Sequence, residues 1–434
     1  MGKGIAGRDA VVSTRREFVK GSAAAALWAI GCKSHTSANR PVKIGYVGPL
    51  TGSLAAFTEP DPFVLNGIRK ATAGGVTIAG KLHPLEIVTK DSRSDPNRAA
   101  EVASDLIKRE DVDILVTAHT PETVSPVSDQ AEINEVPCIT TDAPWQPYFF
   151  GRGGKVDQGF DWTYHFFWGA DQLVDVYTNM WSTIETNKVV GALWGNDNDG
   201  NSFSDPKTGF PPVFAARGFN LVDPGRFQLD IDDFSAQISA FKNAKVEVLT
   251  GVLPPPGFAT FWSQAAQQGF QPKIVTIAKA LLFPAAVESL GPRANRLSTE
   301  VWWSPHHPFR SGLTGQTAAE LCADYESQTG KPWTPPLGFK HALFDVTIDV
   351  LKRVKNIDSP ESIVEAVRAT NCGTVVGPVA WTGKPVRNVC TTPLVGGQWV
   401  KEGNGRFNLP IVNNKHAEEI PVQAELQPID YSGA

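Results

Sequence analysis

The stretch Val42–Gly52, which reads VKIGYVGPLTG, decides the fold class of this 434-residue chain. Its first half is an apolar run rich in β-formers that ends at Gly48 and Pro49, as a buried strand followed by a tight loop does. Runs of the same kind recur along the chain at Leu85–Val88, Val112–Val116, Val136–Ile139, Val189–Trp194, Val246–Leu249 and Ile274–Ile277. Near-continuous apolar runs are typical of parallel strands that are covered on both faces.

Helical patterns fill the intervals between these runs. Pro96 opens one helix, and the apolar residues that follow it, from Ala99 to Ile107, fall on one face. Ser359 and Pro360 open another in the same manner. Alternating strands and helices predict an α/β protein with doubly wound parallel sheets, and the repetition is too long for one sheet. The sequence therefore predicts two such sheets.

Length and composition agree with two soluble domains outside the nucleic-acid-binding classes. A chain of 434 residues with 41% hydrophobic and 20% charged residues is comfortable as two globular domains. Its formal net charge of -5 gives no electrostatic reason for nucleic acid to be a partner. Five cysteines are too few for a disulfide scaffold of this length.

The N-terminus carries an export pattern. Thr14–Lys20 reads TRREFVK, a twin-arginine motif, and is followed by the apolar run Ala23–Ile30. That run is far shorter than the roughly 20 residues that span a bilayer, so residues 1–31 are predicted to be a twin-arginine signal peptide. Cys32 follows in a loose lipobox and is a candidate for lipidation, with residues 32–41 as a tether. The mature protein is then expected in the periplasm or on the outer face of the cytoplasmic membrane.

Several stretches, in order, carry a family resemblance. They are Val42–Gly52, Lys90–Pro96, Pro126–Asp129, Asp233–Ser235, Gln264–Gly269 and Val376–Trp381. Together they resemble the branched-chain amino-acid (Leu/Ile/Val) binding protein family, the periplasmic solute-binding components of ABC importers. The resemblance extends over residues 42–425.

This resemblance implies two α/β lobes joined by three crossover strands, near Trp168, Trp302 and Gly377. The first lobe is then formed by residues 42–168 and 303–376, the second by residues 169–302 and 377–425, with 426–434 as a tail. The solute binds between the lobes, at the carboxyl ends of the strands, and is held by hinge closure. The resemblance implies no cofactor and no catalysis, and its partners are a small-molecule ligand and an ABC permease and ATPase complex.

The loops that follow the strands supply the candidate ligand-binding residues. These are Phe57, Thr120, Glu122, Thr123, Ala143 and Trp145 from the first lobe, and Asn196, Asp199, Pro254 and Lys279 from the second. The loop Thr120–Thr123 matches the family's carboxylate-binding loop, with Pro121 removing one N–H donor. Trp145 either faces the cleft or packs under its own loop.

Lys279 stands where the family has an acidic partner for the ligand's ammonium. Like-charge repulsion beside a lysine favours a ligand with an anionic group there. A small organic acid, with a flat body against Phe57 and Trp145, is the preferred ligand. An amino acid, with its amine on Glu122 or Asp199, and an amide or urea-like solute stay open, as does Lys279 pairing with a surface carboxylate.

The sequence patterns that suggest metal binding or catalysis are incomplete. Asp197–Asn201 resembles a calcium loop but has Pro206 where the bidentate glutamate belongs, and no metal site is predicted. The chain shows no nucleophile elbow, so an exported hydrolase is a remote alternative to a receptor, whereas a same-fold sensor for a membrane receptor is a nearer one. Cys372 and Cys390 are a candidate disulfide, and Cys138 and Cys322 are expected to be buried and free.

Overall fold

The computed structural model describes residues 40–432, and its first sheet is wholly parallel. The strand order is β16-β7-β6-β5-β1-β4. The strands are β1 (Val42–Gly48), β4 (Leu85–Asp91), β5 (Ile114–Ala118), β6 (Cys138–Thr141), β7 (Thr163–Phe166) and β16 (Val389–Cys390). The first apolar run of the sequence thus lies inside this sheet, between β4 and β5, where both faces are covered.

The second sheet is mixed. Its order is β10-β8-β11-β12-β13-β17-β20, with β9 paired to β8. The strands are β8 (Val189–Gly195), β9 (Asn220–Val222), β10 (Arg226–Phe227), β11 (Val248–Leu253), β12 (Ile274–Lys279), β13 (Ser298–Val301), β17 (Val395–Gln398) and β20 (Ile411–Asn413). The pairs β13–β17 and β17–β20 are antiparallel, so this sheet is parallel in its main part and antiparallel at one edge. The late segments of the chain add to the sheet there without crossover helices.

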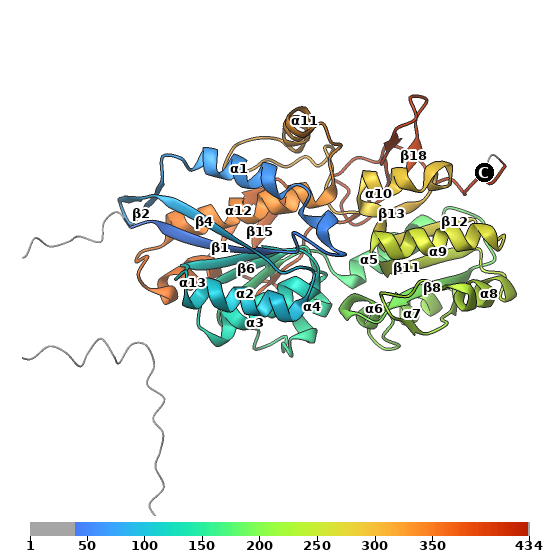
Figure 1. The fold of residues 1–434 in the computed structure, drawn as a ribbon, viewed down its shortest axis with the longest axis horizontal. Coiled ribbons are helices and arrows are strands. Elements are labelled where there is room, and N and C mark those ends of the chain that lie inside the picture. The colour runs from blue at the N-terminus through green and yellow to red at the C-terminus, as the bar shows by residue number, and fades with distance from the viewer. Residues whose placement is uncertain (1–39, 433–434) are drawn as a thin grey trace, which may run out of the picture. The chain divides into compact units, whose positions relative to one another are not determined.

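Helices cover both faces of each sheet. With the first sheet lie α1 (Asp61–Ala71), α2 (Pro96–Lys108), α3 (Pro121–Ile133), α4 (Trp145–Gly151), α11 (Ala318–Thr329), α12 (Pro335–Arg353) and α13 (Pro360–Arg368). With the second lie α5 (Ala170–Trp181), α6 (Asn198–Phe203), α7 (Phe210–Ala216), α8 (Ser235–Asn243), α9 (Pro255–Gln267) and α10 (Pro284–Ser289). In the first lobe α1 and α12 lie on one face of the sheet, and α2 and α3 lie on the other (Figure 1).

The start of α2 shows how the sequence sets these helices. Asp95 caps it by accepting a hydrogen bond from the Arg98 N–H at 2.7 Å, and Pro96 occupies the first turn, where no N–H partner is needed. Its face from Ala99 to Ile107 is buried against the sheet, as the apolar spacing predicts. The short elements are η1 (Ala55–Thr58), η2 (Ala280–Leu282), η3 (Gly291–Ala294) and the hairpins β2–β3 (Val76–Ile78, Lys81–His83) and β18–β19 (Val400–Lys401, Phe407–Asn408).

The chain passes between the sheets after β7, after β13 and after β16, and the last passage differs from the prediction. Gly377 was expected to begin a crossover strand into the second lobe. Instead β15 (Gly377–Ala380) pairs antiparallel with β14 (Asn371–Thr374) in a hairpin. Beyond that hairpin β16 pairs with β7 in the first sheet. The third passage therefore lies between Cys390 and Val395, and residues 377–390 belong with the first sheet.

The candidate disulfide between Cys372 and Cys390 is not formed, since both are free thiols. Cys372 lies in the β14–β15 hairpin, whereas Cys390 lies in the edge strand β16 of another sheet. Burial raises the pKa of Cys372 to about 12, which keeps it a neutral thiol. Cys138 and Cys322 are buried and free, as predicted.

Both ends of the described chain are attached to the sheets. Arg40 forms ion pairs with Asp113 at 2.7 Å and Asp358 at 2.8 Å, so the predicted tether is already bound to the first lobe at residue 40. In the predicted tail, the Tyr431 hydroxyl donates to the Pro272 carbonyl of the second lobe at 2.8 Å. The twin-arginine motif, Cys32 and the rest of the tether lie outside the described residues. Within residues 40–432, no helix has the length and apolarity needed to cross a membrane.

Candidate functional site

A small cavity lies where the carboxyl ends of the two sheets meet. Its aromatic walls come from Phe57, Phe167, Trp168, Phe203 and Trp302, and its polar walls from Thr120, Asp142, Asp199, Lys279 and Glu300. The cavity has a volume of about 20 Å³, enough for roughly one water molecule. A larger solute must therefore enter by parting the lobes and moving the aromatic side chains.

The parallel strands place these residues. In the first lobe, Thr120 caps α3 two residues after β5, and Asp142 directly follows β6. In the second lobe, α6 begins three residues after β8 and carries Asp199, and Lys279 is the last residue of β12. Because strand ends of parallel sheets gather side chains at one edge, both lobes deliver polar groups to the same cavity.

Aromatic rings from both lobes pack across the cavity. Phe57 of the first lobe contacts Phe283 of the second edge-on, with ring centroids 4.9 Å apart, and stacks on Trp302 at 6.3 Å. Trp302 in turn meets Phe167 at 4.9 Å and Trp168 at 6.0 Å. The indole N–H groups of Trp168 and Trp302 are buried and have no hydrogen-bond partner among the described residues. The wall therefore offers flat apolar surface together with two free donors.

Lys279 is held by three carboxylates. Its Nζ lies 2.6 Å from Asp199, 3.3 Å from Asp197 and 3.9 Å from Glu122. Although burial opposes the charge, the nearby carboxylates raise the pKa of Lys279 well above its ordinary value. Glu122 belongs to the first lobe and the other two to the second, so this cluster joins the lobes. Lys279 is thus paired with carboxylates of the protein itself, the alternative that the sequence left open, and these carboxylates are buried or half-buried.

The backbone of Lys279 is strained. Its φ of 64° and ψ of -57° lie close to the rare γ-turn conformation. Glu300 supports this turn by accepting a hydrogen bond from the Lys279 N–H at 3.4 Å. The same carboxylate accepts bonds from the hydroxyls of Tyr177 at 2.5 Å and Thr299 at 2.9 Å. Glu300 thus positions Lys279 and has its oxygens occupied by the protein.

A second buried lysine stands behind the first-lobe wall. Lys340 on α12 lies 3.4 Å from Asp61 and 3.8 Å from Asp142, and it donates to the Ala118 carbonyl at 3.0 Å. Asp61 also accepts a hydrogen bond from the Tyr46 hydroxyl at 2.8 Å. Burial and the Lys340 charge lower the pKa of the adjacent His119 to about 3, so this imidazole is neutral. Lys340 therefore forms ion pairs with two carboxylates, of which only Asp142 lines the cavity.

Asp142 is a buried carboxylate of the wall, and its ion-pair partner is Lys340 at 3.8 Å. Its side chain is fully buried at 0% exposure, and neither carboxylate oxygen has a hydrogen-bond partner among residues 40–432. The hydroxyl of Thr120, on the neighbouring loop, is buried and unpartnered in the same way. Burial raises the pKa of Asp142 to about 7, and it raises the pKa of Asp199 to about 7 as well.

The sequence of this chain matches a known family over most of its length. Residues 41–404 match the family described as periplasmic binding protein. The chain belongs to the periplasmic binding protein family. Members of this family bind solutes outside the cytoplasm and are not enzymes, and this protein is accordingly a solute-binding protein.

Solved structures share the fold of this binding protein. A leucine binding protein from Thermotoga maritima is 21% identical, with a TM-score of 0.67 over 86% of this chain and 99% of that one. A solute binding protein of an ABC transporter from Rhodopseudomonas palustris, in complex with 3,4-dihydroxybenzoic acid, is 19% identical, with a TM-score of 0.69 over 86% and 96%. A branched-chain amino acid binding protein from Streptococcus pneumoniae, in complex with isoleucine, is 17% identical, with a TM-score of 0.67 over 86% and 99%. At these identities the likeness supports the fold.

The structure brings half of the predicted ligand-binding residues of this binding protein together. Phe57, Thr120, Asp199 and Lys279 line the cavity, and Glu122 reaches it through Lys279. The other predicted residues lie as follows: Thr123 is buried in the first turn of α3, Ala143 accepts a bond from His165, Trp145 packs with Phe149 and Phe150, Asn196 is exposed, and Pro254 caps α9.

Sequence reasoning missed Asp142, Glu300, Phe167, Trp168 and Trp302 as wall residues. Asp142 had a signal, because it is a charged residue directly after an apolar strand. Trp168 and Trp302 were placed at lobe crossings but were not assigned to the ligand, although both line the cavity. Glu300 sits within a buried strand, and no local pattern distinguishes its role.

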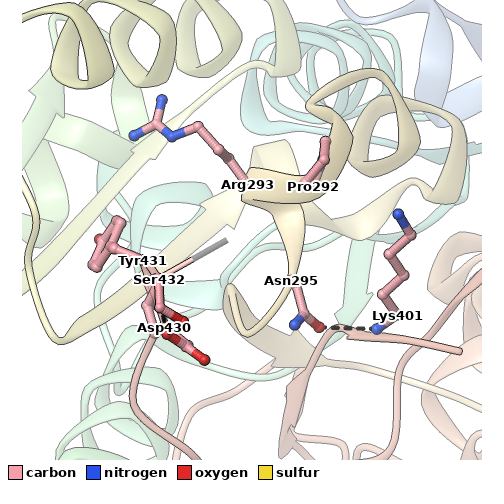
Figure 2. A pocket seen from close by; sticks show the side chains of 8 residues that line it. Pro292, Arg293, Asn295, Lys401, Asp430, Tyr431 and Ser432 are labelled. Carbon is pink, nitrogen blue, oxygen red and sulfur yellow. Dashed lines mark hydrogen bonds between the residues drawn. The ribbon is translucent and has the colours of Figure 1, made fainter. Parts of the chain in front are cut away.

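A larger cavity of about 220 Å³ lies elsewhere in this binding protein, where the end of the chain meets η3 (Figure 2). Asn295 accepts a hydrogen bond from the Lys401 N–H at 2.9 Å on one side, and Asp430 and Tyr431 form the other. All of its lining residues belong to the second lobe or to the segment bound on it. It cannot sense lobe closure, so the smaller cavity between the strand ends is the candidate site. Among the residues described, no group of three His, Cys, Asp or Glu side chains is arranged to hold a metal ion.

Proposed function

We propose that this protein is the extracytoplasmic receptor of a branched-chain amino-acid-type ABC importer. It captures a small organic acid or an amino acid between its lobes and presents the closed form to a permease and ATPase complex. The observation that carries the proposal is the cavity whose walls come from the strand ends of both sheets. A solute that contacts both walls stabilises the closed arrangement over the open one.

Two cross-lobe contacts support closure as the response to binding. The ring pair of Phe57 and Phe283 and the ion pair of Glu122 with Lys279 both join groups of different lobes at the cavity. Opening would expose the rings and hydrate the ions. The bound solute shifts this balance by its differential affinity for the two states.

Closure can be measured directly with mature protein. Trp168 and Trp302 line the cavity, so ligand binding is expected to change tryptophan fluorescence and to reduce the radius of gyration in X-ray scattering. A library of amino acids and organic acids is screened first by melting temperature, because a ligand specific for the folded state raises it by mass action. Phe57→Ala is expected to weaken any hit, and a hit that binds without compaction contradicts the proposed closure.

A sensor that signals to a membrane receptor is the second candidate, because the same closed form can be read by a different partner. Reconstitution with a permease and ATPase complex separates the two. Stimulation of ATP hydrolysis by the ligand-loaded protein supports import, and unchanged hydrolysis with a functional complex favours sensing.

We also propose export by the twin-arginine route with lipidation at Cys32. Replacing Arg15 and Arg16 together with lysine is expected to leave the precursor in the cytoplasm. Cys32→Ser is expected to release the mature protein from the membrane fraction. If the Cys32→Ser protein sediments with membranes as the parent does, the lipid anchor is refuted.

A further inference from the structure

A cluster of four charged side chains joins the two lobes at the cavity, and its charges do not balance. The Nζ of Lys279 lies 2.6 Å from Asp199, 3.3 Å from Asp197 and 3.9 Å from Glu122. The side chain of Asp199 is 1% exposed and that of Glu122 is 18% exposed. If all four groups are ionised, two negative charges stay uncompensated in a site shielded from water, which is costly. A proton bound by one carboxylate halves this excess.

Asp199 is the carboxylate of the cluster best placed to bind that proton. Asp197 accepts hydrogen bonds from the Gly200 N–H at 2.7 Å and from Lys279 at 3.3 Å. Asp199 is paired with Lys279 but accepts no hydrogen bond from a backbone N–H of residues 40–432. Burial raises the pKa of Asp199 to about 7, against the effect of Lys279 and with the help of the Glu122 and Asp197 charges. Asp199 therefore titrates near neutral pH.

The elements around Asp199 supply it with one cation, Lys279. Helix α6 packs against α3, α4, β8 and β11, of which α4, β8 and β11 contain no charged residue. Helix α3 contributes Glu122, and the other charged groups of the cavity wall, Asp142 and Glu300, are also carboxylates. Among the lining residues of the described chain, Lys279 is the only basic one. No second cation of the wall is therefore available to stabilise ionised Asp199 when the lobes are closed.

Glu122 is the member of the cluster that opening removes. It lies on α3 of the first lobe, whereas Asp197, Asp199 and Lys279 lie in the second. When the lobes part, the Glu122 charge moves away from Asp199 and water reaches the cluster, and both changes favour the ionised carboxylate. Closure therefore raises the pKa of Asp199 above its value in the open form. The form with the higher pKa binds more protons, so a lower pH favours closure.

The attraction between the lobes changes in the same direction. With Asp199 ionised, two carboxylates of the second lobe outweigh its one lysine, and the cluster repels Glu122. With Asp199 protonated, one source of this repulsion is gone, and the ion pair of Glu122 with Lys279 at 3.9 Å remains. Protonation thus strengthens the contact that joins the lobes.

We propose that Asp199, Lys279 and Glu122 form a proton-dependent latch between the lobes, which favours the closed form of the solute-free protein on acidification and releases it as the pH rises. This inference rests on the proposed receptor function, because it takes the lobes to part, and it holds whatever solute the cavity binds. The pH outside the cytoplasm then sets how much of the solute-free protein is open for capture.

X-ray scattering of the mature, solute-free protein from pH 5.5 to pH 8.5 tests the latch. Because the closed-form pKa of Asp199 is about 7, the radius of gyration should be constant above pH 8 and fall as the pH drops below 7. One bound proton raises the ratio of closed to open protein by up to about 10-fold per pH unit, so at least a ~10-fold change is expected over the range. A radius of gyration that is independent of pH, or that grows on acidification, overturns the inference.

Three variants identify the group that binds the proton. Asp199→Asn imitates the protonated carboxylate and is expected to stay closed at every pH, whereas Asp232→Asn, at an exposed position of the same lobe, should titrate as the parent does. Asp142→Asn removes the other wall carboxylate whose pKa is about 7, and it should also keep the pH response. If Asp142→Asn abolishes the response and Asp199→Asn does not, the proton binds on the first-lobe wall and the inference is overturned.

Glu122→Gln tests the latch without altering a fully buried group. It is expected to be more open than the parent at pH 5.5 and to show a smaller change with pH, because no charge then crosses between the lobes. A pH response equal to that of the parent contradicts the latch. If the solute-free protein ignores pH but compacts with a solute, the latch alone fails and the receptor function stands. If neither pH nor any solute compacts it, the receptor function fails as well.

Discussion

Two buried lysines lie near the same cavity, and they differ in whether their partners come from one lobe or from both. Lys340 lies on α12 behind the first sheet, and its partners Asp61, Asp142 and Ala118 all belong to the first lobe. Lys279 ends β12 of the second lobe, yet one of its carboxylates, Glu122, comes from the first. The first lysine is enclosed within one lobe, whereas the second lies across the boundary that opens.

Lys340 therefore stabilises the first lobe by itself, whereas Lys279 makes a contact that depends on whether the lobes are closed. Opening the lobes should leave Asp61 and the Ala118 carbonyl beside Lys340, whereas it should separate Lys279 from Glu122 and expose the Lys279 cluster to water. Water can then replace lost ion-pair partners at Lys279 and cannot do so at Lys340. The cost of removing each lysine should therefore differ, although the side chains of both are buried.

The largest effect is expected from Lys340→Met. It leaves Asp61, whose pKa is lowered by Lys340 and His119 against the effect of burial, as an uncompensated buried carboxylate. The free energy of unfolding, measured by urea denaturation, should fall by about 3–5 kcal/mol. Lys279→Met should cost less, about 1–3 kcal/mol, because Asp199 can take up a proton and Glu122 can reach water.

The surface provides the control for these two variants. Lys331 pairs with Glu59 at 3.5 Å, and its side chain is 56% exposed, so Lys331→Met should change stability by less than ~1 kcal/mol. Equal losses from Lys340→Met and Lys279→Met would show that the Lys279 cluster belongs to the permanent core, and the comparison would then fail.

An effect of intermediate size is expected in the pH dependence of stability, through the titration of Asp142. Its folded-state pKa of about 7 exceeds the ordinary value of 3.8, so the folded protein retains a proton that the unfolded chain releases between pH 4 and 7. This group therefore contributes less stability as the pH rises through that window. Asp142→Asn lacks the titration, so its melting temperature should gain on that of the parent from pH 5 to pH 8, by an equivalent of about 1–3 kcal/mol.

The difference in melting temperature between Asp142→Asn and the parent isolates Asp142, because both proteins share the other titrating groups. Burial lowers the pKa values of His119, His165 and His307 to about 3, so both proteins should lose stability below pH 6. The difference between variant and parent cancels this common loss. A difference that stays constant from pH 5 to pH 8 would mean that Asp142 is ionised throughout.

The sequence predicted the sheets and the loops that line the cavity, because these depend on local patterns. Apolar runs mark the strands, and parallel strands deliver the residues that follow them to one edge, which located Phe57, Thr120, Asp199 and Lys279. The passage at Gly377 was predicted wrongly because a hairpin and a crossover strand share the same short β-rich pattern. Only the pairing of β15 with β14 distinguishes them.

Partners across the fold were beyond sequence reasoning. The sequence showed that Lys279 is basic where the family has an acidic residue. Its partners Asp197 and Glu122 lie 82 and 157 positions away in the chain, and no local sequence pattern predicts that they contact it. This pairing removes the argument for an anionic ligand that was based on an unpaired Lys279. Charge at a site is a property of the cluster, and a cluster is assembled by topology.

The smallest effect on stability, and the sharpest on closure, is expected from Glu122→Gln. Glu122 lies 3.9 Å from Lys279 with its side chain 18% exposed, and the free energy of unfolding should change by less than ~1 kcal/mol. The ligand-free protein should nonetheless open more, with a larger radius of gyration in X-ray scattering at low salt. Glu59→Gln is the matched control, since Glu59 is 21% exposed and pairs with a lysine of its own lobe at 3.5 Å. If both variants open alike, the attraction between Glu122 and Lys279 does not hold the lobes together.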